Sequence, residues 1–305
     1  MLAVLAPGQG AQSPGVLAPW LAVPGAPERV DAWSRATGLD LLRLGTTAGA
    51  DEVRDTAVAQ PLLTAAALLS ASAVLDGRPD VVCGHSVGEL AALAVAGVLE
   101  ESDAVRLAAE RGRAMARAAA LRPTGMSAVL GGDRDEIFAA ATRHGLQVAT
   151  VNGPGQVVLG GPVEGLAALA ATPPASARVR PLEVAGGFHT AAMLPAVGRM
   201  QSLVAALPVQ DAGCPVVANA DGAALTGGRE LADRLVTQLT WPVRFDRCVE
   251  RLSALGVTAV VELAPGGTLA GIVRRALPDV AVVAVRTPAD LPAARDLAAE
   301  PAAVG

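Results

Sequence analysis

Short, mostly apolar runs alternate along the chain with longer stretches in which apolar residues recur at helical spacing. Apolar runs that are bounded by turn residues predict strands buried on both faces. The clearest of them are Leu2–Leu5, Val81–Cys83, Val257–Leu263 and Val280–Val285. The helical stretches include Val87–Ala96, Asp103–Ala119 with Ser102 as its expected N-cap, and Thr268–Ala276. Strands that alternate with helices predict an α/β fold with a mainly parallel sheet.

The middle of the chain has a different order of elements. After Pro123 the pattern predicts the strand Met126–Leu130, the helix Arg134–His144, the strands Gln147–Val151 and Gln156–Leu159, the helix Val163–Ala171 and the strand Arg178–Val184. This β-α-β-β-α-β order is typical of a ferredoxin-like unit. We therefore predict a small ferredoxin-like domain over residues 123–186, inserted into a large α/β domain that comprises residues 1–122 and 187–305.

Composition adds little to the fold but argues against several function classes. Of the 305 residues, 52% are hydrophobic and 17% charged, which is typical of a globular protein. The net charge is −5, no basic run occurs and aromatic residues make up 2%, so nucleic-acid binding is not expected. Cys83, Cys214 and Cys248 are widely spaced, which predicts buried reduced thiols in a cytoplasmic protein, with no disulfide and no metal site.

Neither a signal peptide nor a membrane-spanning segment is expected. The apolar N-terminal run that ends at Pro7 is short and lacks a basic region. No apolar run reaches about 18 residues without a charge or a helix breaker. The stretch Val87–Leu99 comes closest, and Glu89 interrupts it.

The segment Gly84-His85-Ser86-Val87-Gly88 matches the pattern G-x-S-x-G between an apolar strand and an apolar helix. A serine at such a tight strand-to-helix turn projects its hydroxyl from the sheet, and the flanking glycines permit the turn and the close approach of helix and strand. The helix N-terminus supplies backbone N–H groups for an oxyanion. The pattern therefore predicts that Ser86 is a nucleophile.

A serine nucleophile needs a base, and the chain has three histidines. His85 adjoins Ser86, so its side chain should point away from the serine hydroxyl, and we expect a structural role. His144 precedes a glycine at a predicted helix end, where it favours the helix dipole. His189 lies in a glycine-rich loop at the re-entry into the large domain, where catalytic residues tend to occur. We therefore expect His189 to be the base.

Arg111 lies on the apolar face of its predicted helix, in line with Leu107 and Met115. Burial of a guanidinium without a partner is very costly, so Arg111 needs an anionic partner from the protein or from a ligand. A structural salt bridge would satisfy it. Arginine is also the side chain suited to two-point recognition of a carboxylate, and the presence of a predicted serine nucleophile favours a carboxylated substrate.

Several short motifs occur in one order along nearly the whole chain. They are Pro7–Gln12, Gln60-Pro61, Gly84–Glu89, Arg111-Gly112, Phe188-His189, Gln238-Leu239 with Pro242-Val243, and Pro265-Gly266. With this set the chain resembles the malonyl-CoA:acyl carrier protein transacylase family and the related acyltransferase domains of polyketide synthases. The resemblance implies an α/β-hydrolase-like large domain with the ferredoxin-like domain inserted.

The resemblance also implies a ping-pong acyl transfer. Ser86 would be the nucleophile and His189 the general base of a Ser–His dyad. The backbone N–H groups of Gln9 and Val87 would form the oxyanion hole. The substrate would be malonyl-CoA, and the acceptor would be the phosphopantetheine thiol of acyl carrier protein, for fatty acid or polyketide synthesis, with no bound cofactor.

Three further residues receive roles from the same resemblance. Arg111 would hold the malonyl carboxylate. Gln238 would support the site, with its backbone carbonyl orienting His189 in place of an aspartate. Phe188 resembles the residue of polyketide-type malonyl-selective domains, and its ring would crowd a 2-methyl group and so disfavour methylmalonyl.

Other functions are weighed against this one. An α/β-hydrolase such as a thioesterase shares the G-x-S-x-G turn, but in its sequence the catalytic acid precedes a catalytic histidine near the C-terminus. Here no histidine follows His189, and the acid would have to be Asp103, Asp133 or Asp135. A non-catalytic scaffold on the same fold would usually lack the serine or the histidine. A transferase for another carboxylated acyl-CoA remains the main alternative.

The implied partners are a coenzyme A thioester and acyl carrier protein, and a monomer is expected. Carrier proteins are acidic, so exposed arginines could dock one. The candidates are Arg178, Arg180, Arg274 and Arg275. Arginines at a helix C-terminus, such as the last two, more often complement the helix dipole.

Overall fold

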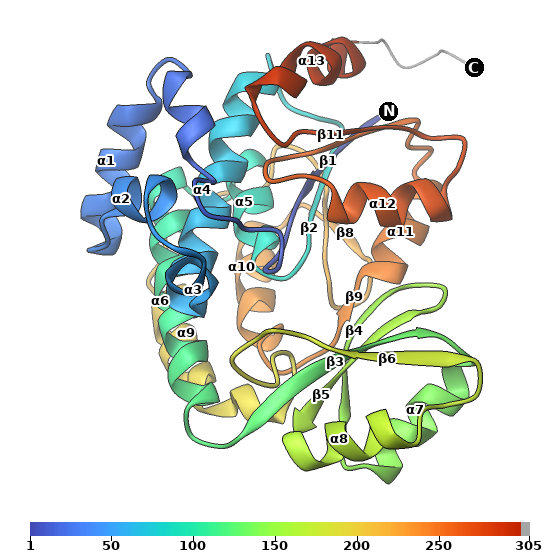
Figure 1. Ribbon diagram of the computed structural model, residues 1–305. Coiled ribbons are helices and arrows are strands. Elements are labelled where there is room, and N and C mark those ends of the chain that lie inside the picture. The colour runs from blue at the N-terminus through green and yellow to red at the C-terminus, as the bar shows by residue number, and fades with distance from the viewer. Residues whose placement is uncertain (300–305) are drawn as a thin grey trace.

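A six-stranded sheet forms the centre of the larger part of the protein in a computed structural model, which describes residues 1–299 (Figure 1). Its strand order is β11-β10-β1-β2-β7-β8, and the first five strands are parallel whereas β8 is antiparallel to β7. The strands are β1 Leu2–Ala6, β2 Val81–Gly84, β7 Val216–Val217, β8 Ala224–Leu225, β10 Ala259–Glu262 and β11 Ala281–Ala284. The α/β prediction is therefore confirmed.

Helices cover both faces of this sheet. In β1, Val4 and Ala6 belong to the core on one face, and Ala3 and Leu5 to the core on the other, as the two-residue period of a strand requires. In Figure 1, α4, α5 and α6 lie on one side of β1 and β2, and α11 and α12 on the other. The helices of this part are α1 Ala26–Thr37, α2 Leu41–Thr46, α3 Ala50–Arg54, α4 Thr56–Val74, α5 Gly88–Val95, α6 Glu101–Ala119, α9 Leu194–Ala205, α10 Gly228–Thr237, α11 Phe245–Ala254, α12 Thr268–Ala276 and α13 Leu291–Ala299, with the 3-10 helices η1 Ala18–Ala22, η2 Ala191–Met193 and η3 Pro288–Asp290.

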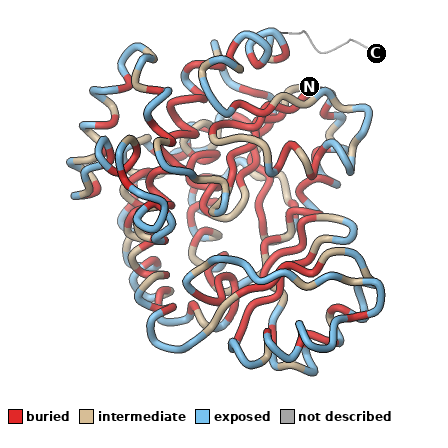
Figure 2. The backbone as a smooth tube through the Cα atoms, in the orientation of Figure 1, coloured by how far each residue is buried: buried red, intermediate tan, exposed pale blue. Residues whose placement is uncertain are grey.

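Helix α4 corrects the expectation about apolar segments. Within residues 1–299 it is the one helix that is long and apolar enough to cross a membrane by length and composition. The segment that comes closest to a membrane span is therefore Thr56–Val74 and not Val87–Leu99, the stretch expected from the sequence. Of its 18-residue window, 89% is buried inside the protein, where α4 packs against α5 and α6 (Figure 2). Burial against protein on nearly all sides makes α4 a core helix of the fold.

A second sheet has the order β6-β3-β5-β4-β9. Its elements are β3 Thr124–Gly131, α7 Arg134–Arg143, β4 Gln147–Gly153, β5 Gln156–Pro162, α8 Val163–Ala171, β6 Ala177–Pro181 and β9 Val243–Arg244. The strands β6, β3, β5 and β4 pair with one another in antiparallel fashion, and β9 is parallel to β4. Because β9 comes from outside residues 123–186, this sheet extends beyond the predicted segment.

Several expected helix and strand ends differ from the structure by one to three residues, and two of these differences matter for the site and its helices. Helix α6 begins at Glu101, with Glu100 as its N-cap, so Ser102 lies in the first turn and not at the cap. Strand β6 ends at Pro181, before the predicted end at Val184. Residues 182–184 instead lead from the small sheet along the pocket described below, which Leu182 and Val184 line.

Candidate active site

Ser86 occupies the turn between β2, which ends at Gly84, and α5, which begins at Gly88. Its φ of 53° is unusual for a residue with a side chain and marks a strained turn. The glycines at both ends are required by packing. A Cβ at Gly84 would lie 2.1 Å from the Gly88 carbonyl carbon, and a Cβ at Gly88 would lie 2.2 Å from the Ala6 oxygen. The sequence thus places the Ser86 hydroxyl at the end of the parallel sheet.

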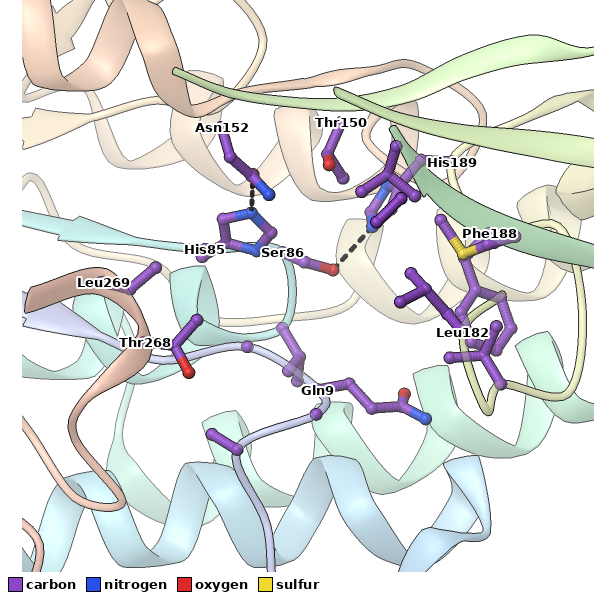
Figure 3. A pocket seen from close by; sticks show the side chains of 18 of the residues that line it. Gln9, His85, Ser86, Thr150, Asn152, Leu182, Phe188, His189, Thr268 and Leu269 are labelled. Atoms are coloured by element: carbon purple, nitrogen blue, oxygen red, sulfur yellow. Dashed lines mark hydrogen bonds between the residues drawn. The ribbon is translucent and has the colours of Figure 1, made fainter. Parts of the chain in front are cut away.

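His189 lies against Ser86, with 2.7 Å between its Nε2 and the serine Oγ (Figure 3). Its Nδ1 lies 2.7 Å from the backbone oxygen of Gln238. A carbonyl oxygen can only accept, so Nδ1 carries the proton and Nε2 presents its lone pair to the hydroxyl. Burial, reinforced by the positive charge of Arg111, lowers the pKa of His189 to about 3. The imidazole is therefore neutral at pH 7 and can accept the serine proton.

Arg111 projects from α6 and is only 1% exposed, as its place on the apolar face predicts. Nη1 donates to Gln60 Oε1 at 2.8 Å, and Nη2 donates to Gln238 Oε1 at 2.8 Å and to Ser86 Oγ at 3.3 Å. Its Nε has no partner within the described residues. Burial lowers the pKa of Arg111 to about 10, so it remains charged at pH 7.

The alternative that a structural salt bridge satisfies Arg111 is therefore not supported, because no such ion pair is present within residues 1–299. Glu89 is the acid whose charge acts on the guanidinium, but the direct hydrogen-bond partners of Arg111 are neutral oxygens. A buried cation that is held by neutral groups can still attract an anion. The Arg111 Nη2 lies 3.3 Å from Ser86 Oγ, so an anion bound there would lie next to the serine hydroxyl.

A pocket of about 230 Å³ opens over Ser86 between the two sheets. Gln9 and Val87 lie in its wall, and within the described residues neither of their backbone N–H groups donates a hydrogen bond. Phe188 is 5% exposed and lies with Leu182 at the same wall of the pocket (Figure 3). The other lining residues include the apolar side chains of Met126, Ala128, Val158, Leu269 and Ile272 and the polar side chains of Gln60, His85, Thr150, Asn152, Gln156 and Thr268.

The structure thus brings together all seven residues that the sequence points to. Six of them line the pocket, namely Gln9, Ser86, Val87, Arg111, Phe188 and His189. Gln238 lies behind them, where its backbone oxygen contacts His189 and its side chain contacts Arg111. Uncommitted N–H groups, a neutral base and a buried cation around one hydroxyl can support transfer of an anionic acyl group through an ester.

Two polar residues of this region were not predicted. Asn219, which follows β7, accepts a hydrogen bond from the Ser86 backbone N–H at 2.7 Å and donates to the Gly84 oxygen at 2.6 Å. Glu89 is 5% exposed in α5 and contacts both Asn219 and Gln238. The position of Glu89, a charged residue inside the apolar run that follows the G-x-S-x-G turn, was a visible signal of a buried polar contact. The sequence around Asn219 has no comparable pattern.

The other two histidines have the positions that the sequence predicts. His85 points to Asn152, with 2.9 Å between Nε2 and Oδ1, and burial lowers its pKa (Figure 3). His144 is the C-terminal cap of α7. Neither side chain is hydrogen-bonded to the Ser86 hydroxyl within the described residues.

Within residues 1–299, none of the three acids considered for a hydrolase triad is hydrogen-bonded to His189. Asp103 pairs with Arg106 at 2.6 Å. Asp133 accepts hydrogen bonds from the first turn of α7, including the backbone N–H of Asp135. The partner of His189 Nδ1 is a backbone carbonyl, so the arrangement is a dyad.

Comparisons with known proteins agree with this chemistry. The family described as acyl transferase domain matches residues 5–295. The malonyl CoA-acyl carrier protein transacylases of Mycobacterium bovis and Mycobacterium tuberculosis are each 50% identical over 296 residues, which cover 95% of this chain and 98% of the relative. The crystal structure of MCAT from Mycobacterium tuberculosis matches with a TM-score of 0.94 at 49% identity, over 97% of this chain and 99% of that one. A type II PKS acyl-carrier protein complex with its malonyl-transacylase matches through a chain that is 30% identical, with a TM-score of 0.90 and the same coverage.

Proposed function

The chain belongs to the acyl transferase domain family, among its malonyl CoA-acyl carrier protein transacylases, and from this premise we propose that Ser86 carries the malonyl group between two thiols. One observation supports this role more than any other. The Ser86 Oγ lies 2.7 Å from a neutral imidazole nitrogen of His189 and 3.3 Å from a guanidinium nitrogen of Arg111. A base and a carboxylate-binding cation thus meet at one hydroxyl.

In the first half of the reaction, Ser86 Oγ attacks the thioester carbon of malonyl-CoA while His189 Nε2 takes the hydroxyl proton. The carbon–sulfur bond then breaks, and the sulfur of coenzyme A leaves with that proton. In the second half, the phosphopantetheine thiol of acyl carrier protein gives its proton to His189 and attacks the serine ester. Ser86 recovers the proton, and the malonyl group is now a thioester of the carrier. The cycle needs no bound cofactor.

The tetrahedral intermediates place negative charge on the former carbonyl oxygen. The backbone N–H groups of Gln9 and Val87 are proposed to receive it, which is supported by their place in the pocket wall and by their lack of another acceptor. The N-terminal end of α5, which begins one residue after Val87, adds a positive dipole end. Each such donor is worth a factor of roughly 10²–10³ in rate.

Arg111 and Phe188 are proposed to select the acyl group. Among the residues that the structure describes, the Arg111 Nε has no partner and the two other guanidinium nitrogens are held by neutral oxygens, so a malonyl carboxylate would be the first anion to bind Arg111 directly. The ring of Phe188 borders the same pocket and would crowd a 2-methyl substituent. Together they favour a carboxylated and unbranched acyl group.

The finer fold assignment is part of the same proposal. We infer a hydrolase-like large domain formed by residues 1–122 and 187–305, and a ferredoxin-like domain at residues 123–186. The strand order β6-β3-β5-β4 with α7 and α8 on one face supports the latter. We further propose a cytoplasmic monomer that supplies malonyl units for fatty acid or polyketide synthesis. Exposed arginines such as Arg178 and Arg275 remain candidates for carrier docking.

Intact-protein mass spectrometry after brief exposure to malonyl-CoA tests the proposed function. The wild type should gain one malonyl group, and holo acyl carrier protein should discharge it. Ser86→Ala should gain none. His189→Ala should load far more slowly, whereas the matched control His144→Ala should load like the wild type. Fast release of coenzyme A with no adduct would indicate a hydrolase, and neither adduct nor release would refute malonyl transfer.

A further inference from the structure

Glu89 is a buried acid behind the pocket that no step of the proposed reaction uses. It lies on α5, three residues after Ser86, and it does not line the pocket. Its Oε1 accepts the backbone N–H of Asn219 at 2.6 Å, and its Oε2 accepts the side-chain Nε2 of Gln238 at 2.6 Å. Both oxygens accept a hydrogen bond from an N–H donor, which is the arrangement of the ionised carboxylate, the form that dominates above pH 7.

The Gln238 side chain is thereby placed between the buried acid Glu89 and the buried cation Arg111. Its Nε2 donates to Glu89, and its Oε1 accepts from Arg111 at 2.8 Å. A carboxylate only accepts and a guanidinium only donates, so the amide satisfies both groups in one orientation alone. The backbone oxygen of the same residue holds His189. The orientation of one glutamine therefore connects the buried acid with both the cation and the base.

We propose that Glu89 is a positioning residue, which balances the charge of Arg111 through Gln238 and so leaves the guanidinium free of a direct ion pair until the substrate carboxylate binds. This inference rests on the proposed function. A carboxylate in direct contact with Arg111 would occupy the nitrogens that a malonyl carboxylate needs. With a neutral amide in between, the buried cation is stabilised and its binding site stays open to an acyl carboxylate.

The surroundings of Glu89 agree with a charge-balancing role. The charged and titratable groups that act on it are Arg111 on α6, Arg234 on α10, and Asp221 beside α10, while Cys248 on α11 lies close enough to feel its charge. Arg234 is already paired with Asp221 at 2.9 Å and with Glu230 at 3.0 Å. Arg111 is therefore the cation near Glu89 that has no ion pair of its own within residues 1–299.

Two variants test the inference with malonyl-CoA and acetyl-CoA as donors. Glu89→Gln replaces a double acceptor by a group with one acceptor and one donor, so the Gln238 amide loses its fixed orientation. We expect kcat/KM for malonyl-CoA to fall about 30-fold, mainly through KM, and that for acetyl-CoA to change less than about threefold. The exposed Glu28→Gln is the control for the type of substitution and should behave like the wild type.

The double variant Glu89→Gln/Gln238→Glu separates positioning from folding. It restores one order of donors and acceptors from the Asn219 N–H through positions 89 and 238 to Arg111. The carboxylate at position 238 now contacts Arg111 directly, and it also faces the Ser86 backbone oxygen and Asn219 Oδ1, which accept from the Gln238 amide in the wild type. We expect malonyl transfer to stay at least about 30-fold below wild type, and a melting curve shows whether the variant is folded.

Two results would overturn the inference: equal losses for both acyl donors in Glu89→Gln, or wild-type malonyl transfer in the double variant. Both results are interpreted only after wild-type protein has been shown to load malonyl on Ser86. If the wild type fails to load malonyl, the proposed function is refuted, and the inference, which rests on it, is refuted as well.

Discussion

The burial of Glu89 makes a quantitative prediction about stability and pH that does not depend on the reaction. Burial raises the pKa of this carboxyl from 4.5 to about 7, although the Asn219 backbone N–H and the charge of Arg111 act to lower it. The perturbation is Glu89→Gln, which replaces a titrating side chain by a neutral one of nearly the same shape. We predict that the stability difference between variant and wild type changes with pH.

The sign follows from proton binding. Below pH 4.5 Glu89 is protonated in the folded and the unfolded protein, so its ionisation has no effect. Between pH 4.5 and about 7 the folded protein keeps a proton that the unfolded chain has released, so wild-type stability falls as pH rises. The loss is less than about 1 kcal/mol at pH 5 and roughly 3 kcal/mol at pH 8. Relative to the wild type, Glu89→Gln should therefore gain roughly 2–3 kcal/mol from pH 5 to pH 8.

Urea unfolding of both proteins at several pH values between 5 and 8 measures this difference. The variant also loses hydrogen bonds to Asn219 and Gln238, which lowers its free energy of unfolding by the same amount at every pH. The predicted quantity is the change of the stability difference with pH, which this constant amount does not affect. Glu28→Gln, at an exposed position, should show a difference that is independent of pH. A flat difference for Glu89→Gln would refute the reasoning, because it would mean that Glu89 ionises alike in both states.

Three further changes have expected outcomes. Arg111→Ala should lower kcat/KM for malonyl-CoA about 100-fold and that for acetyl-CoA less than about threefold, because two charged hydrogen bonds to the carboxylate are lost; equal losses would argue against carboxylate binding. Phe188→Ser should raise the rate of methylmalonyl loading relative to malonyl loading about tenfold in a competition read by mass spectrometry, since one methyl group gains space; an unchanged ratio would exclude the ring as the selective element. Gly88→Ala should lower the free energy of unfolding by at least about 2 kcal/mol, because its Cβ would lie 2.2 Å from the Ala6 oxygen, whereas Gly198→Ala, with no atom within 4 Å, should be neutral or stabilising in urea unfolding.

Hydrophobic pattern alone predicts much of the fold, because long buried elements leave a clear period in the sequence. The helices Val163–Ala171 and Thr268–Ala276 have the predicted bounds. The strands β7, β8 and β9 have two residues each, which is too short for any period to be recognised. The pairing of β9 with β4 is a contact between distant segments that no local pattern can reveal. Ser102 was a plausible cap, but α6 begins before it.

For the candidate site, the sequence reveals those residues whose type conflicts with their local surroundings. Ser86 stands in a glycine-flanked turn, and Arg111 stands on an apolar helix face. Both conflicts are local, so they are visible without a structure. Asn219 follows a two-residue strand, and its neighbours carry no period, so its contact with the Ser86 backbone depends on the tertiary fold. The role of Gln238 came from resemblance alone.

His189 and Arg111 both lie against the Ser86 hydroxyl, and this proximity explains why each is held by neutral groups. An aspartate in place of the Gln238 carbonyl would hold the imidazole, but it would also lie next to a guanidinium that carries no ion pair within residues 1–299. The two would attract each other, and the site for a substrate carboxylate would be filled by the protein. A backbone oxygen orients His189 without that competition. The charge of Arg111 also lowers the pKa of His189, so a malonyl carboxylate bound there would cancel part of this effect and raise the basicity of the imidazole once the acyl group is in place.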